Sequence, residues 1–381
     1  MDAPPPPRRT EPRLSLLIAE ADPDGGHTGT RLSAQTAAGQ AVRLRRGIYA
    51  PLERWLTAAP WQRYEFAVAA AAWRDPARVF CRETALLLHG VPLASTPEAV
   101  TQRTSHRGDV GIRSTPPLLG MVNRRQQQLL MTQWSQRLGR RLREKDLSPI
   151  PLRRHLGVLP GGVAEQSWTG AGRISQHQRV GAEALPGVHG PAVGYHVESL
   201  GLALADTLPR LPFAETMVAA DAVLAGRYGG GPAQSVDQLL DWMPWASSQR
   251  AAARFRRILD FADARAESPG ESMSRAVIRQ LGFEDPELQV VIDTDAGRRY
   301  GDFGWRGGRI IGEFDGKAKY LDSVRISGDD AATVLWKEKR RQEAVERTGR
   351  LVARWGWEEL QRPHLLEKIL LAKGVPRSTG P

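Results

Sequence analysis

Residues 300–317 read YGDFGWRGGRIIGEFDGK, and this stretch decides the fold of the last third of the chain. The segments YGDFGW and RIIGEFDGK predict two neighbouring strands. On the second, Glu313, Asp315 and Lys317 are two residues apart, so they share a face as long as the strand stays extended. Asp302, on the first strand, can reach that face. The sequence therefore predicts an acidic site with one lysine at this end of a sheet.

Carboxylates that converge on one point repel one another unless a cation lies among them, and an oxygen-only ligand set suits Mg²⁺ or Mn²⁺. We therefore predict metal ligation by Asp302, Glu313 and Asp315. Lys317 would lie beside the attacking water and the scissile phosphate. The competing interpretation is structural, since Asp-Gly is also the commonest hairpin signal.

The flanking segments predict a helix, three strands, a helix, a strand and a closing helix between residues 268 and 360. The first helix begins at Ser268, a predicted N-cap, with Pro269 in its first turn, and Glu271 follows in that turn. The segment LQVVIDT, 288–294, is the first strand. The later helix, WKEKRRQEAVERTG, is basic, and its Lys337, Lys339 and Arg340 form either a solvated face or a nucleic-acid contact.

These motifs resemble the PD-(D/E)XK nuclease superfamily, and within it the relatives of the very-short-patch repair endonuclease. The resemblance implies a restriction-endonuclease-like α/β sandwich and a catalytic set that consists of Asp302, Glu313, Asp315, Lys317 and Glu271. Two features depart from the pattern. Tyr320 stands where many relatives have a histidine, and the lysine spacing fits Asp315 while Glu313 lies one step earlier.

Near the N-terminus, AVRLRRGIYAP, residues 41–51, predicts a β-hairpin with its turn at Gly47. Alternation lets Val42, Leu44, Ile48 and Tyr49 line a core, while Arg43, Arg45 and Arg46 point outward. Helices are predicted over 30–38, over 62–74 and from near Cys81 to Gly90. This order is typical of a small winged helix-turn-helix.

Residues 12–95 resemble the AbiEi-type antitoxins of type IV toxin-antitoxin systems, which implies a DNA-reading domain that represses its own operon. The Gly-rich segment 22–29 departs from the family, which has a regular helix-turn there. In this arrangement helix 30–38 enters the major groove, with Arg31 and Gln35 as base readers and Arg43, Arg45 and Arg46 on phosphate.

We thus expect an α/β multidomain protein. Its parts are a disordered tail (1–12), a winged-helix domain (13–95), a mixed and helical connector (96–265) and the nuclease-like domain (266–375). The connector contains an Arg-rich, helix-favouring stretch, 123–145, which is more typical of a solvated helix face than of a phosphate-binding surface. Short strands followed by helices are expected over 165–265.

Composition is consistent with a polyanionic partner but does not establish one. The 381 residues carry a formal charge of +11 and a pI near 10.2. The single cysteine, Cys81, excludes an internal disulfide and a cysteine-based zinc site. The histidines have no metal-ligand spacing, so no zinc is assigned. Without an apolar leader or a long apolar run, we expect a cytoplasmic protein that does not enter a membrane.

Three functions remain open at this point. The first is an antitoxin-like transcriptional regulator that binds DNA and is fused to a metal-dependent nuclease-like domain. The second is an active Mg²⁺-dependent DNA endonuclease in repair or phage defence, targeted by the winged helix. The third is a toxin-binding protein whose basic surfaces meet an acidic partner. The sequence identifies neither the DNA target nor a cognate toxin nor an oligomeric state.

Overall fold

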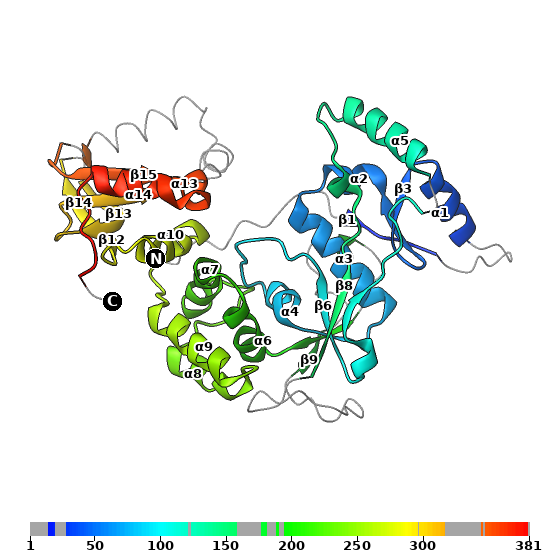
Figure 1. Ribbon diagram of the computed structural model, residues 1–381, viewed down its shortest axis with the longest axis horizontal. Coiled ribbons are helices and arrows are strands. Elements are labelled where there is room, and N and C mark those ends of the chain that lie inside the picture. Colours follow the sequence, from blue (N-terminus) through cyan, green and yellow to red (C-terminus); the bar gives the residue numbers. More distant parts are fainter. Residues whose placement is uncertain are drawn as a thin grey trace. The chain divides into compact units, whose positions relative to one another are not determined.

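The computed structural model describes residues 14–19, 28–120, 123–157, 177–180, 188–189, 194–295, 297–316, 344–345 and 347–379 (Figure 1). The chain is a mixed α/β protein that divides into two compact units. The first consists of Met1–Leu88 and Thr96–Leu204, and the second of His89–Ser95 and Ala205–Pro381. The boundary at 204/205 falls inside the predicted 96–265 connector, and residues 89–95 of the predicted 13–95 domain belong to the second unit.

A three-stranded antiparallel sheet with one helix opens the first unit. Its elements are β2 (Leu17–Ile18), α1 (Thr28–Ala37), β3 (Ala41–Arg45) and β4 (Ile48–Pro51), and the strand order is β2-β4-β3. Gly47 turns the hairpin with φ of +78°, a conformation that favours glycine. Val42, Leu44, Ile48 and Tyr49 are all buried. The predicted hairpin, its apolar side and the helix before it are confirmed.

Three further helices pack on this sheet: α2 (Leu52–Thr57), α3 (Pro60–Arg74) and α5 (Arg124–Arg137). Leu130, Met131 and Trp134 of α5 pack against the hydrophobic core that contains Trp55 and Phe66. The β3 edge is covered too, because the Arg43 amide donates to the carbonyl of Leu118 at 2.7 Å. The Arg-rich stretch thus contains a helix, α5, with one apolar side on the core.

The rest of the first unit is a six-stranded mixed sheet. Its order is β7 (Gly111–Arg113), β8 (Leu152–Leu156), β6 (Val100–Thr104), β5 (Val79–Phe80), β11 (Tyr195–Glu198) and β9 (His177–Val180). Helix α4 (Arg82–Leu88) follows β5, and β1 (Leu14–Ser15) pairs with β10 (Val188–His189) in parallel. Arg103 Nε lies 2.5 Å from Glu198 Oε1, and both side chains are buried. This ion pair joins β6 to β11.

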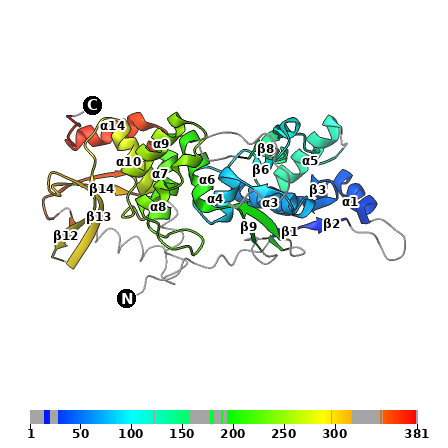
Figure 2. The ribbon, with the colours of Figure 1, turned by 90° about the horizontal axis from the view of Figure 1, so that it is seen from below.

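Helices begin the second unit, in the order predicted for the end of the connector. They are α6 (Leu200–Thr207), which starts at the end of the first unit, α7 (Phe213–Leu224), α8 (Val236–Leu240), α9 (Gln249–Phe261) and α10 (Pro269–Gln280). Short 3-10 turns cover Leu208–Arg210 and Met243–Trp245 in this unit, and Arg107–Asp109 and Glu144–Leu147 in the first. Ser268 Oγ accepts a hydrogen bond from the Glu271 amide at 3.3 Å, so the predicted N-cap is confirmed. Helices α7, α9 and α10 lie together in Figure 2.

A four-stranded sheet completes this unit, with strands β12 (Glu287–Thr294), β13 (Gly297–Trp305), β14 (Ile310–Phe314) and β15 (Leu351–Trp355) in chain order across it. The first three are antiparallel, and β15 runs parallel to β14. Helices α13 (Trp357–Gln361) and α14 (Pro363–Ala372) follow. The predicted order of elements is confirmed where the chain is described. Of the predicted basic helix, 336–349, residues 336–343 and 346 lie outside the described residues.

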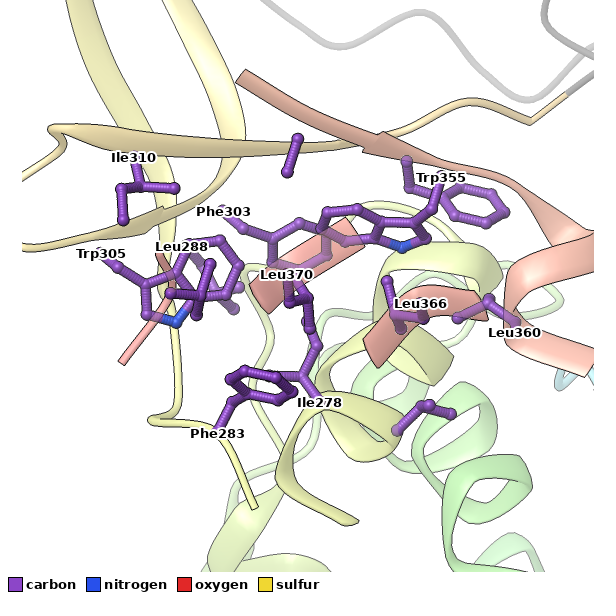
Figure 3. Close-up of a cluster of buried hydrophobic side chains, with 14 of the residues drawn as sticks. Ile278, Phe283, Leu288, Phe303, Trp305, Ile310, Trp355, Leu360, Leu366 and Leu370 are labelled. Carbon is purple, nitrogen blue, oxygen red and sulfur yellow. The ribbon is translucent and has the colours of Figure 1, made fainter. Parts of the chain in front are cut away.

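Apolar clusters cover both faces of this sheet. On one face Phe303, Trp305 and Trp355 pack against α10 and α14 (Figure 3). Gly270 allows α10 to approach closely, because any side chain there would collide with the Phe314 ring. The opposite face holds a smaller cluster built on Ile292 and Ile311. Strand β14 is therefore buried from both sides, and all five of its residues are buried.

Helices α7 and α10 are joined by a buried ion pair. Arg275 Nη1 lies 2.8 Å from Asp221 Oδ2, and the Asp263 amide donates to Asp221 Oδ1 at 2.8 Å. Burial raises the pKa of the Asp221 carboxyl, and the Arg275 guanidinium opposes this effect. Removing one partner would leave the other buried without its charge partner.

We expect Asp221→Ala to lower the free energy of unfolding by about 3–5 kcal/mol, because Arg275 would keep its buried charge. Asp293→Ala is the matched control, since it removes an aspartate whose side chain is 80% exposed in its pair with Arg298. Its effect should stay below about 1 kcal/mol. Urea unfolding followed by far-UV circular dichroism measures both. Equal losses in the two variants would contradict this account.

Candidate functional site

Asp302 lies on β13 beside the buried strand β14. Strand β13 pairs with β14 through Phe303, Gly304 and Trp305, and Asp302 comes one residue before these pairs. Its Oδ2 accepts a hydrogen bond from the Phe314 amide at 2.8 Å. The carboxylate thus serves as a partner for a main-chain N–H of β14 and is held next to the Glu313–Asp315 segment. The predicted proximity of Asp302 to this segment is confirmed.

Glu313 is buried on β14 and forms an ion pair across the parallel strands. Its partner in the register is Arg354 of β15, whose Nη2 lies 2.5 Å from Glu313 Oε2. Because side chains alternate along a strand, Glu313 faces away from Phe314, which packs in the cluster on Phe303 and Trp355. Glu313 therefore meets a guanidinium on the face away from that cluster.

Asp315 follows the last residue of β14. Its amide donates to the Trp355 carbonyl at 2.8 Å, so the main chain still runs beside β15. The side chain is half-buried, and no described residue forms a hydrogen bond or ion pair with its carboxylate. Lys317, Lys337, Lys339 and Arg340 lie outside the described residues, as does Tyr320.

Glu271 is connected through Gln289 of β12 to the part of the sheet that contains Asp302. The Glu271 carboxylate is buried, and it accepts hydrogen bonds from the Glu267 amide at 2.8 Å and from Ser268 Oγ at 2.7 Å. Gln289 Nε2 donates to Glu271 Oε2 at 3.3 Å. Gln289 has φ of +54° and interrupts the pairing between β12 and β13 opposite Asp302. The first turn of α10 is therefore tied to the strand next to Asp302.

The carboxylates differ in their suitability as metal ligands. Among the described residues, no three side chains of His, Cys, Asp or Glu form a group that could hold a metal. Mg²⁺ needs only one or two protein carboxylates when water and phosphate oxygens complete its octahedron. Glu313 is already paired with Arg354, and the Glu271 carboxylate is already hydrogen-bonded at the start of α10.

Gln289 and Arg354 were missed by the sequence analysis. Arg354 belongs to an apolar strand segment, 350–357, and the alternation of side chains along this segment does not indicate that Arg354 pairs with Glu313. Only the parallel register between β14 and β15 places it opposite Glu313. Gln289 is the one amide side chain in an otherwise apolar strand, and this exception was the available sign that it has a specific partner.

The residues proposed to contact DNA near the N-terminus differ in their exposure to solvent. Arg31 on α1 and Arg46 in the hairpin turn are exposed, and Gln35 is partly exposed. Arg43 is only half-exposed on β3. These positions leave Arg31 and Arg46 open to a polyanion.

Arg45 does not point outward, so this part of the prediction is wrong. Its guanidinium is buried and donates to the Leu44 carbonyl at 2.7 Å and the Ile150 carbonyl at 3.0 Å. Burial lowers the pKa of Arg45 to about 10. The pairing of β3 with β4 shifts between Arg43 and Arg45, and this irregularity breaks the alternation on which the prediction depended.

Comparison with known proteins gives no match: no family model, no curated protein and no solved structure is similar to this chain. Within the described ranges, no helix is long and apolar enough to cross a membrane. The resemblances expected from the motifs therefore remain expectations.

Asp302→Ala and Asp302→Asn should differ in stability, because an asparagine oxygen can still accept from the Phe314 amide. We expect the alanine variant to lose about 1–3 kcal/mol, since it leaves a buried N–H without a partner. The asparagine variant should lose less. Chemical denaturation measures both, and an equal loss would show that this hydrogen bond does not hold the strand.

Proposed function

We propose that this chain is a DNA-binding regulator of antitoxin-like type, whose second unit is a nuclease-like domain of the PD-(D/E)XK kind. The observation that carries the nuclease-like part is the hydrogen bond from the Phe314 amide to Asp302. It holds one carboxylate beside a buried strand that contains Glu313 and is followed by Asp315. The order of α10, three antiparallel strands and a parallel fourth strand supports the same proposal.

Each side chain of the acidic site would have a distinct task. Asp302 and Asp315 would hold a divalent cation, Mg²⁺ or Mn²⁺, which when bound polarises a phosphodiester and activates water. Glu313 would keep Arg354 at the sheet, where the guanidinium can contact a phosphate oxygen. Glu271 would fix Gln289 and the first turn of α10 next to Asp302. Lys317 would stabilise charge that develops on the phosphate.

The DNA-binding part of the proposal is supported by the first unit. Its strand order, β2-β4-β3, with α1 directly before the hairpin, is that of a small winged helix. Arg31 and Gln35 on α1 would read bases, and Arg46 in the turn would contact phosphate. The overall charge of +11 favours such a partner.

A cleavage assay separates a regulator with a nuclease-like domain from an active endonuclease. Supercoiled plasmid and short duplexes would be incubated with the full chain in Mg²⁺, Mn²⁺ or chelator. An active endonuclease nicks the plasmid in a chelator-sensitive way, and Asp302→Asn and Lys317→Ala each lower the rate at least about a hundredfold.

The matched control is Glu358→Gln, which removes an exposed carboxylate of the same unit and should leave cleavage unchanged. If no DNA is cut while binding is intact, the acidic site is a binding platform and the regulator account stands. Cleavage that survives Asp302→Asn would remove the acidic site from the mechanism.

DNA binding by the full chain should depend on Arg46 and not on Arg45. Arg46→Ala removes one exposed charge, so the affinity should fall and the slope of log K against log salt should decrease by about 1. Arg45→Ala should instead lower the melting temperature, because it leaves two carbonyls without donors. Fluorescence anisotropy over a salt series and differential scanning fluorimetry measure these effects. A steeper salt slope in Arg46→Ala would contradict the proposed contact.

A further inference from the structure

A cavity of about 330 Å³ lies behind α1 in the first unit. Helix α1 lines one side with Ser33, Thr36 and Ala37, and the hairpin contributes Arg43 and Tyr49. Leu119, Gly120 and Gln126 form the opposite side. The volume is at the lower end of the range for pockets that bind small molecules. The cavity is thus large enough for a compact ligand.

The cavity has a positive charge and no negative one among its lining residues. Arg43 Nε is shielded from solvent and has no hydrogen-bond partner in the part of the chain that is described. The Arg43 main-chain amide is occupied by the Leu118 carbonyl, but the guanidinium has no carboxylate partner among the described residues. An arginine cannot lose its charge by deprotonation. A half-buried guanidinium whose shielded Nε lacks a partner favours an anion.

The other polar groups of the lining are donors or can donate. Ser33 Oγ and Tyr49 Oη lie 3.1 Å apart, so one hydroxyl donates to the other and one hydroxyl hydrogen remains. Gln126 Oε1 accepts from the Asn123 amide at 3.2 Å, and its amide nitrogen has no partner among the described residues. Ala37 and Leu119 supply the apolar part of the lining.

We propose that this cavity binds a small organic acid, a single carboxylate on a compact apolar body, with Arg43 as its counter-charge. The planar guanidinium matches a carboxylate in geometry as well as in charge. The hydroxyl pair and Gln126 complete the set of donors, and Ala37 and Leu119 contact the apolar body. The proposal moves Arg43 from the DNA contacts to a ligand site.

The position of the cavity couples the acid to α1. Ser33, Thr36 and Ala37 are spaced three and four residues apart, so they form one stripe of the helix. At roughly 100° per residue, Arg31 and Gln35 lie on the opposite side. A ligand on the first stripe therefore biases the position of the side chains proposed to read DNA. This second step rests on the proposed DNA-binding function, whereas binding of the acid does not.

Calorimetric titration of the full chain tests the site with two acids, benzoate and cyclohexanecarboxylate, and with benzamide as the neutral isostere. We expect both acids to bind and benzamide to bind at least about tenfold more weakly, because it lacks the charge. Arg43→Gln should weaken acid binding at least about tenfold. Arg46→Gln, the matched control in the exposed turn, should leave it unchanged.

Ala37→Leu gives an independent test, because it fills the cavity from α1 and leaves Arg43 in place. It should also abolish binding of the acids. Failure of both acids to bind at millimolar concentration overturns the proposal, as does equal binding of benzamide or full binding by Arg43→Gln.

DNA affinity measured with and without saturating benzoate tests the coupling. A change in the wild type that is absent in Arg43→Gln supports it, and an unchanged affinity overturns it. If the chain binds the acid but no DNA, the DNA-binding function fails while the ligand site stands.

Discussion

The hydrogen bond from the Phe314 amide to Asp302 is the constraint on which the acidic site depends. Strand β14 is buried on both faces, so each of its main-chain polar groups needs a partner within the protein. Asp302 supplies one such partner. This hydrogen bond within the sheet therefore fixes the position of the Asp302 carboxylate, and no ligand is needed to hold it there. The same holds for Glu313, which the Arg354 ion pair orients. Folding itself therefore places these charges, as the proposed site would require.

Local signals in the sequence predicted the elements that carry this site. Ser268 and Pro269 mark the start of α10, Gly47 marks the hairpin turn, and apolar alternation marks β3, β4 and the C-terminal strands. Each signal depends on neighbours within a few residues, which is the range over which propensity and capping act. The proximity of Asp302 to Glu313 and Asp315 also followed, because a short hairpin leaves little freedom in pairing. Arg354, which only the register between β14 and β15 places opposite Glu313, was not predicted. Gln289 was not predicted either, although it is the one amide side chain in an apolar strand.

Arg45 shows why the remaining positions could not be read from the sequence. Strict alternation places Arg43 and Arg45 on the same outward side, yet the register shift between them turns Arg45 inward. Once inside, its guanidinium is held by two carbonyls, one of them more than a hundred residues away at Ile150. The stretch AVRLRRGIYAP does not indicate that the Ile150 carbonyl will lie beside Arg45. Burial of a charged side chain is decided by the partners that tertiary structure supplies.

Buried arginines also limit what the net charge implies about partners. Arg103 and Arg275 are paired with Glu198 and Asp221 inside the two units, so these pairs add nothing to the surface field. Arg45 adds a charge that lies under the surface. A polyanion would instead meet the exposed cations, among them Arg31 on α1 and Arg46 in the hairpin turn. The proposed DNA binding therefore depends on where these side chains lie and not on the total of +11, because a field is set by the position of charges as much as by their number.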